Sequence, residues 1–347
     1  MPVVQGGDRC SHGRRDAPAE TGTVAAPETK GDARSMPDAE LHFHAITARG
    51  RESGGGATDA CFPYWSFTKT VIAISAAKLS DAGVLDLDAA IAGEQFTVRQ
   101  LLSHTAGLPD YGSLPEYHRA VAAGDDPWPR DRMIEAVLSR GPLFTPGEGW
   151  SYSNIGYMLA RERIEAASGV GFGRLVDETI RRPLGLDSIA LATTREQFSR
   201  LHWPAARHYH PGWVYHGCLT GTARDAAALL HALWCGRLLG ERGLAEMLVR
   251  RPLGGAIPGR PWTECGYGLG LMSGRMGDAG RAIGHSGGGP FCVNAVYHFP
   301  DRDEPVTVAC FTDGTAEGRA EFEAVAVACT GRPSPGTERA RAPRSRS

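Results

Sequence analysis

A serine and a lysine three residues apart, Ser66 and Lys69, form a pair that could carry out nucleophilic catalysis. Residues three apart share one face of a helix, so the lysine amine can reach the serine hydroxyl. A hydroxyl is a weak nucleophile until a neighbouring base takes its proton, and a lysine in a dry pocket can have its pKa lowered enough to serve. The spacing alone is a weak signal. It predicts acyl transfer only if other residues complete the site.

A second pair with the same spacing, Ser75 and Lys78, competes with the first. At about 100° per residue, a shift of nine residues places Ser75 on the opposite side of the helix from Ser66, so both pairs cannot face one cleft. Ser66 stands where the helix is expected to start, after the aromatic run 62–65, where backbone N–H groups would point at a developing oxyanion. Ser75 lies among alanines, and we expect it to be a packing residue.

Two further motifs supply groups that acyl transfer requires. In the first, Tyr152-Ser-Asn154, a phenol near a charged lysine could act as a base, and the asparagine amide could hold Lys69 or an amide-like substrate. The same residues could simply cap the helix that follows. In the second, 284–290, glycine N–H groups could bind an oxyanion, although a plain hairpin turn is an equal alternative.

The elements that must position these residues follow a clear order along the chain. An alternating strand over 40–49 is followed by a helical middle and then by short β-like runs. We expect helices over 66–82, 97–103, 131–139 (capped by Asp131), 155–167, 172–182 (ended by Pro183), 224–235 and 316–329, and strands over 267–272, 291–299 and 306–312. This order predicts an α/β fold of the α+β type, in which an antiparallel β-sheet built from both chain ends is flanked by helices and carries an inserted all-helical region.

The predicted organisation has five parts. Residues 1–36 and 331–347 are polar or rich in Arg, Pro and Ser, and are expected to be disordered. Residues 37–110 and 255–330 would form a sheet-containing α/β domain, and 111–254 a mostly helical domain.

Composition and charge narrow the function. A net charge of −2 provides no field for nucleic acid or an anionic membrane, and no cofactor motif is present. The eight cysteines form no C-x-x-C pair and are expected to be free thiols. Residues 1–36 lack the apolar segment of a Sec signal peptide, and no run is long enough to span a bilayer. We therefore expect a cytoplasmic protein.

The three motifs in this order resemble the superfamily of class C β-lactamases, DD-peptidases and family VIII esterases. The resemblance extends from about residue 40 to 329 and includes four further segments: Leu-Leu-Ser-His-Thr-Ala-Gly-Leu-Pro at 101–109, Pro-Leu-Gly-Leu at 183–186, Gly-Tyr-Gly-Leu-Gly-Leu at 266–271 and Gly-His-Ser-Gly-Gly-Gly at 284–289. Such a match is specific for the superfamily and says little about the substrate.

The resemblance implies a site of seven residues: Ser66, Lys69, Tyr152, Asn154, His285, Gly287 and Gly288. Ser66 would be acylated after activation by Lys69 and Tyr152. Asn154 would bind the substrate and Lys69, and the N–H groups of Ser66 and Gly288 would form the oxyanion hole. His104, in the 101–109 segment, would be structural.

His285 would stand where relatives carry Lys or His, beside the acyl group. An imidazole with an ordinary pKa of about 6.5 gains charge as the pH falls toward 6, so we expect a weak attraction for substrate carboxylates that grows on acidification.

The sequence departs from the family pattern at two places. Phe291 stands where relatives have glycine and would narrow the acyl pocket, and the Gly-rich segment 54–56 suggests a trimmed early strand.

The stretch 202–218 matches no motif. It contains four histidines and a cysteine beside four aromatic residues: His202, His208, His210, His216, Cys218, Trp203, Tyr209, Trp213 and Tyr215. A metal site would suit these ligand types, but their spacing fits no standard pattern. We instead expect an aromatic loop near the mouth of the cleft and no metal.

We therefore predict a serine hydrolase that forms an acyl-enzyme on Ser66 from a small ester or amide. The lack of an export signal favours an esterase, a D-amino-acid amidase or a small-peptide hydrolase over a cell-wall peptidase. Two alternatives remain at this point: a transacylase or amide synthase in a biosynthetic pathway, or a penicillin-binding or sensor-type domain that acylates without turnover. Oligomeric state is not predicted.

Overall fold

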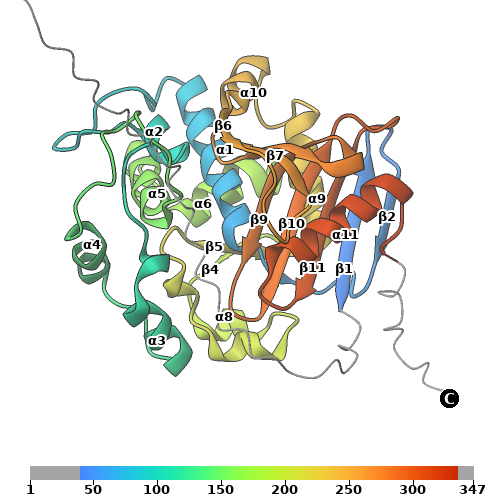
Figure 1. Ribbon diagram of the computed structural model, residues 1–347, viewed down its shortest axis with the longest axis horizontal. Helices are drawn as coiled ribbons and strands as arrows, with labels where there is room; N and C mark the ends of the chain where they lie inside the picture. Colours follow the sequence, from blue (N-terminus) through green and yellow to red (C-terminus); the bar gives the residue numbers. More distant parts are fainter. Residues whose placement is uncertain (1–39, 335–347) are drawn as a thin grey trace, which may run out of the picture. The chain divides into compact units, whose positions relative to one another are not determined.

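A computed structural model describes residues 40–334, so the expectations for 1–36 and for the end of the tail lie outside the described residues. Its main sheet has eight strands in the order β2-β1-β11-β10-β9-β8-β7-β6, and all strand pairs are antiparallel (Figure 1). The strands are β1 (Leu41–Thr47), β2 (Glu52–Gly55), β6 (Arg251–Gly254), β7 (Trp262–Tyr267), β8 (Met272–Met276), β9 (Arg281–Gly288), β10 (Cys292–Phe299) and β11 (Val306–Asp313). The sheet therefore combines strands from both ends of the chain, as the sequence predicts.

Helices cover both faces of this sheet. Along β10, Val293, Ala295 and Tyr297 pack in one apolar cluster with α11 (Glu317–Thr330), while Cys292 and Val296 belong to the larger cluster on the other face, which includes α9 (Ala223–Trp234). Because side chains alternate between the two faces of a strand, a strand buried on both faces reads as a continuous apolar run. The largely apolar composition of β10 and β11, which are buried along nearly their whole length, has this cause.

The remaining helices lie mostly in the middle of the chain. They are α1 (Thr68–Asp81), α2 (Val98–Leu102), α3 (Pro115–Ala123), α4 (Arg130–Leu138), α5 (Asn154–Ser168), α6 (Phe172–Val176), α7 (Arg182–Leu184), α8 (Arg195–Ser199) and α10 (Glu241–Leu248). A second sheet has the order β3-β5-β4, with β3 (Phe62–Pro63), β4 (Ala190–Ala192) and β5 (Cys218–Gly221). Residues 40–334 belong to one compact unit, and α9 packs on β1 and β11 although it falls within the predicted helical region 111–254.

Several sequence predictions need correction. Asp131 does not cap α4; it lies in the first turn, and Pro129 occupies the capping position. Pro183 does not end its helix, because a π-helical turn over Asp177–Arg181 leads into α7, which ends at Gly185. The Gly-rich segment before Ser66 does form a strand, β2, of only four residues.

The predicted strand over 267–272 is instead the connection between β7 and β8. Gly270 has a φ of +67°, and a β-carbon there would lie 2.6 Å from that of Ala73 on α1. The carbonyl of Gly270 accepts a 2.7 Å hydrogen bond from the hydroxyl of Thr70. Only glycine allows this backbone to pack so closely against α1. The glycines therefore mark a docking loop, which fixes the helix that carries Lys69.

Two findings concern localisation and redox state. Among residues 40–334, no helix combines the length and the apolar character that crossing a bilayer would demand. The seven cysteines of the described part of the chain are free thiols, as predicted; Cys10 lies outside it.

Candidate active site

Ser66 lies in a tight turn held against the main sheet. It belongs to a 3₁₀ turn, Trp65–Phe67, that leads directly into α1. Trp65 has a φ of +44°, a conformation rare for a residue with a bulky side chain. The side-chain amide of Asn294 on β10 donates to the carbonyls of Pro63 and Tyr64, at 3.2 and 3.0 Å. This contact fixes the segment before Ser66 on the sheet and supports the uncommon backbone conformation.

Residues 284–288 of the third predicted motif belong to strand β9, so the motif is not a hairpin turn alone. A β-carbon on Gly287 would lie 2.7 Å from the backbone nitrogen of Ser66, and one on Gly289 would overlap the Trp65 indole at 2.3 Å. The glycines of the motif therefore allow the serine turn to rest directly on β9. Gly288 follows Gly287 on the same strand, and a β-carbon added to it would lie 3.3 Å from Cγ of Glu317.

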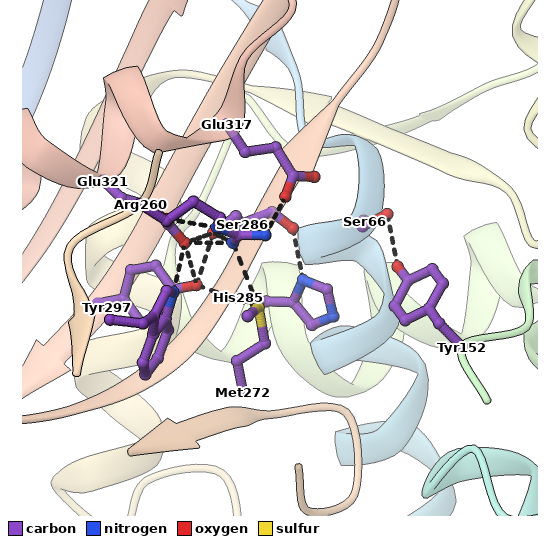
Figure 2. Close-up of polar contacts among 10 residues, drawn as sticks. Ser66, Tyr152, Arg260, Met272, His285, Ser286, Tyr297, Glu317 and Glu321 are labelled. Carbon is purple, nitrogen blue, oxygen red and sulfur yellow. Dashed lines mark hydrogen bonds and ion pairs between the residues drawn. The ribbon is translucent and has the colours of Figure 1, made fainter. Parts of the chain in front are cut away.

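The hydroxyl of Ser66 lies between two proton-carrying groups. Lys69 Nζ is 3.0 Å from Ser66 Oγ, and the phenol of Tyr152 donates a 2.9 Å hydrogen bond to the same oxygen. Figure 2 shows Tyr152 and Ser66 pointing toward each other, with His285 on the other side of Ser66. The structure thus brings together the three residues that sequence analysis selected as catalytic.

Lys69 is fully buried at this point. Its Nζ also contacts Asn154 Oδ1 at 2.6 Å. Burial lowers the pKa of Lys69 from 10.5 to about 7, although the nearby carboxylates of Asp110 and Glu317 act in the opposite direction. A lysine with such a pKa is substantially neutral at physiological pH and can accept a proton.

Asn154 is oriented by a neighbour that the sequence analysis did not identify. Asp110 accepts from the Asn154 backbone N–H at 2.7 Å and from its side-chain Nδ2 at 3.0 Å, which leaves Oδ1 facing Lys69. The adjacent Ser153 caps α5 by accepting from Gly156 N–H at 3.0 Å. Asn154 therefore holds Lys69 and Ser153 caps the helix, so both interpretations of the motif apply, each to a different residue.

Tyr152 differs from expectation in one respect. Burial raises the pKa of its phenol well above 10, so the phenol stays protonated. The prediction that a charged lysine pushes Tyr152 toward the phenolate is wrong, because Lys69 is itself driven toward neutrality by the same burial. Of the two groups beside Ser66, Lys69 is therefore the one whose pKa suits a base, whereas the Tyr152 hydroxyl keeps its proton and donates it in the hydrogen bond to Ser66 Oγ.

His285 is also a correction. Its ring is 2% exposed; Nδ1 contacts the carbonyl of Ser286, and Nε2 lies 2.9 Å from the hydroxyl of Tyr267. Burial, reinforced by Lys69, lowers the pKa of His285 to about 3. The expected gain of charge between pH 8 and 6 is therefore wrong.

A buried charge cluster lies next to the third motif. Arg260 forms ion pairs with Glu317, at 2.8 Å, and with Glu321, and donates to Ser286 Oγ at 3.1 Å (Figure 2). Glu321 is fully buried and also accepts from Trp262 and Tyr297, whereas the side chain of Glu317 is 32% exposed. One guanidinium thus faces two carboxylates, and the more exposed carboxylate lies beside Gly288.

The stretch 202–218 does not form one site. His210 caps a short turn through a 2.9 Å bond from Gly212 N–H, and His208 is exposed. The four aromatic side chains, Trp203, Tyr209, Trp213 and Tyr215, are buried, and the expected aromatic loop near the mouth of the cleft stays a prediction. Phe291 packs against this region, with its ring centroid 6.2 Å from that of Tyr209. Narrowing of the acyl pocket by Phe291 stays a prediction.

His202 lies in a group with Glu40 and His42 whose ligand atoms are within 4.8 Å of one another. A metal-bound histidine ordinarily donates from its second ring nitrogen. Here the backbone N–H of Ala57 donates to His42 Nδ1 at 2.8 Å, so that nitrogen carries no proton. This hydrogen bond disfavours metal ligation by His42.

His216, from the same stretch, reaches Lys69. Its Nε2 lies 3.2 Å from Lys69 Nζ, and the ring is 2% exposed. Sequence analysis missed this role, because a single histidine 147 residues away from Lys69 carries no local signal. Asp110 could have been found, since it directly follows the 101–109 segment and has glycine two residues later, a pattern typical of a capping aspartate.

Solved structures of similar fold were found over most of the chain. The D-amino acid amidase from Ochrobactrum anthropi SV3 has a TM-score of 0.68 at 25% identity, covering 83% of this chain and 92% of that one. A D-stereospecific amidohydrolase from Streptomyces sp. has a TM-score of 0.66 at 24% identity, with the same coverage. These likenesses confirm the predicted fold class.

Curated relatives match over shorter regions. Penicillin-binding protein 4* of Bacillus subtilis is 31% identical over 171 residues, 46% of this chain and 35% of its own length. Esterase EstB of Burkholderia gladioli is 28% identical over 148 residues, 37% of this chain and 38% of its own length. The matched regions thus span little more than a third of these relatives.

The sequence model of the family described as Beta-lactamase matches residues 38–332, nearly all of the described chain. That match, the amidase-like fold and the relatives above agree with the resemblance of the three motifs. The chain therefore belongs to the Beta-lactamase family.

Proposed function

We propose that the protein cleaves small amides or esters through an acyl-enzyme on Ser66. The observation that carries this proposal is the position of Ser66 Oγ, 3.0 Å from Lys69 Nζ and 2.9 Å from the Tyr152 hydroxyl. A base on one side and a proton donor on the other are what acyl transfer requires of a serine.

The reaction follows from these positions. Neutral Lys69 takes the proton of Ser66 as Oγ bonds to the acyl carbon, and Tyr152 gives its proton to the departing amine or alcohol. The Lys69 ammonium then returns a proton to the Tyr152 phenolate, which leaves the acyl-enzyme and both groups as they began. Deacylation follows the same steps: water loses its proton to Lys69 as its oxygen bonds to the acyl carbon, and Tyr152 gives its proton to the departing Ser66 Oγ. The Lys69 ammonium then returns a proton to the Tyr152 phenolate.

The N–H groups of Ser66 and Gly288 are proposed to hold the oxyanion of each tetrahedral intermediate. Support comes from the direct packing of Gly287 on the Ser66 backbone nitrogen. Donors on a strand and on the start of a helix, both fixed by packing, need no rearrangement when the charge develops.

The substrate is proposed to be an amide or ester without a carboxylate near the scissile bond. His285, with a pKa of about 3, is neutral, and Arg260 is outnumbered by Glu317 and Glu321. The excess negative charge beside Gly288 favours a substrate with a free amine, because opposite charges attract strongly where water is partly excluded. The likeness to the D-amino acid amidase supports aminoacyl amides in particular.

Three matched substrates test this assignment: D-phenylalaninamide, its N-acetyl derivative and its N-succinyl derivative, which are cationic, neutral and anionic. We expect kcat/KM at pH 7.5 to fall in that order and the L-amides to be poorer. The ratio of the neutral to the anionic substrate should stay constant from pH 6 to 8, because His285 does not titrate there. Glu317→Gln should reduce the preference for the free amine.

Preference for the succinyl derivative at pH 8 would contradict the substrate assignment. Intact-mass measurement separates hydrolysis from the alternatives. A stable acyl-enzyme without product would indicate a sensor-type domain, and acyl transfer to an added amine in preference to water would indicate a transacylase.

A further inference from the structure

His216 is buried against the amine of Lys69 and has no assigned role. It precedes β5, and its Nε2 lies 3.2 Å from Lys69 Nζ. Its other ring nitrogen, Nδ1, has no hydrogen-bond partner within normal distance among the described residues. A buried polar atom without a partner is costly, so the contact with Lys69 requires an explanation.

The hydrogen-bonding capacity of Lys69 supplies that explanation. Its Nζ has three polar neighbours: Ser66 Oγ, Asn154 Oδ1 and His216 Nε2. An ammonium has three N–H donors, one for each neighbour. A neutral amine has two N–H donors and one lone pair, and the lone pair must face a group that can donate a proton. Asn154 Oδ1 cannot donate, so the lone pair can face only Ser66 or His216.

The tautomer of His216 decides between these two. A proton on Nε2 would compete with Ser66 for the lone pair, whereas a proton on Nδ1 leaves Nε2 as an acceptor of a Lys69 N–H. The Nδ1–H tautomer is the one compatible with the function proposed above, because it leaves the Lys69 lone pair free to face Ser66 Oγ.

We propose that His216 is a positioning residue: as the Nδ1–H tautomer it accepts one N–H of Lys69, Asn154 accepts another, and the Lys69 lone pair is thereby left facing Ser66 Oγ. This role rests on the function proposed above. His216 itself neither gains nor loses a proton during the reaction, and it touches no reacting atom.

The charged and titratable groups around the pair are compatible with a neutral His216. Asp110 and Glu317 face Lys69, and Arg161 on α5 acts on His216 together with Lys69 and His285. Burial, together with the charge of Arg161 and that of Lys69 when it is protonated, keeps the pKa of His216 well below 6.5. The ring is therefore a neutral acceptor throughout the pH range in which Lys69 titrates.

The test compares His216→Leu, which removes the acceptor, with His216→Gln, whose side-chain oxygen can replace Nε2. For His216→Leu we expect kcat to fall roughly 10- to 100-fold with KM nearly unchanged, the effect of a misdirected reactive group. The acidic limb of the kcat profile should move to lower pH, because losing an acceptor destabilises the ammonium more than the amine. His216→Gln should recover most of both. His298→Leu removes another buried imidazole, on β10, and should leave the limb in place.

An unchanged limb and kcat in His216→Leu, or a loss that Gln does not recover, would overturn the role. If the Leu variant does not fold, selective ¹⁵N-histidine labelling of the wild type decides the tautomer directly, and a proton on Nε2 at pH 8 contradicts the proposal. Failure of the proposed function looks different: Ser66→Ala would then still react with a fluorophosphonate probe, whatever His216 does.

Discussion

Two Ser-x-x-Lys pairs lie in one helical segment, and only one of them forms a contact between its serine and its lysine. Ser66 Oγ and Lys69 Nζ are 3.0 Å apart. In the second pair, Ser75 Oγ donates to the carbonyl of Val71 at 2.9 Å, and Lys78 Nζ donates to the carbonyl of Leu238 at 2.9 Å. The identical spacing therefore brings the two groups together at the helix start and leaves them apart in its interior.

The difference arises from what surrounds each pair. Ser75 lies inside α1, where its hydroxyl bonds the preceding turn, as buried serines in helices often do. Ser66 lies in the turn before α1, so its hydroxyl has no carbonyl to bind in a preceding helical turn. Lys69 is fully enclosed by groups from α5 and from the segment before β5, whereas Lys78 lies at the end of the helix. Reactivity thus depends on position and on distant partners, and the spacing is only a precondition.

The largest effect is expected from the serines. Ser66→Ala should lower kcat/KM by about 10⁴-fold or more, because nothing replaces the nucleophile. It should also abolish labelling by a fluorophosphonate probe, while Ser75→Ala leaves labelling intact. Gel fluorescence after probe treatment measures both, and labelling that persists in Ser66→Ala would falsify the assignment.

The lysines and Tyr152 come next. Lys69→Met and Tyr152→Phe should each lower kcat/KM by about 10²- to 10⁴-fold, the range for general acid–base groups. The double variant should lose little more than either single one, because both act through Ser66 Oγ. Lys78→Met is the matched control and should keep wild-type kinetics. Effects that multiply in the double variant would refute a shared proton relay.

A smaller effect concerns pH. Lys69 must be neutral to accept a proton, and its pKa is about 7, so kcat/KM should rise as the pH increases through about 7 and then level off. Lys78→Met should retain this limb. Rate measurements from pH 5.5 to 9 with the N-acetyl amide check it, and a limb near pH 10 would show that Lys69 is not the group observed.

The smallest effect is on stability. The folded pKa of Lys69 is about 7 against an ordinary 10.5, so the unfolded state binds more protons between these values. Burial of Lys69 therefore lowers the free energy of unfolding progressively as the pH falls from about 10.5 to 7, and the loss is complete below pH 7. Lys69→Met should raise the Tm most at pH 6.5 and least at pH 10, whereas Lys78→Met should show a weaker trend of the same sign, because Lys78 is only partly buried and its pKa is lowered less. Thermal unfolding at both pH values measures the difference.

Much of the site could be predicted because its residues lie in short motifs. Ser66 and Lys69 are brought together by helical periodicity, and Tyr152 and Asn154 belong to one turn before α5. The family resemblance then indicates that the two motifs meet. What the motifs could not indicate is protonation: the lowered pKa of Lys69 and the raised pKa of Tyr152 both follow from burial, which only the folded chain reveals.

The missed features depend on long-range packing. His216 and Arg260 join the site from segments with no recognisable pattern, and β9 was overlooked because its glycines resemble a turn. Those glycines are needed for the serine turn to pack on the strand. The glycine run that made the strand resemble a turn in the sequence is therefore the feature that allows the site to form.

The pairing of β1 with β11 also determines when the active site can fold during synthesis. Leu41 is partnered with Thr312 and Thr47 with Val306, and the Asn294 amide that secures Tyr64 is made 230 residues after it. Contacts between residues so far apart in the sequence slow folding, and the N-terminal segments stay unpaired until the C-terminal strands have been synthesised. A ribosome-bound chain therefore carries Ser66 and Lys69 long before it carries a working site. Hydrolytic activity should appear abruptly, when the last strand leaves the exit tunnel.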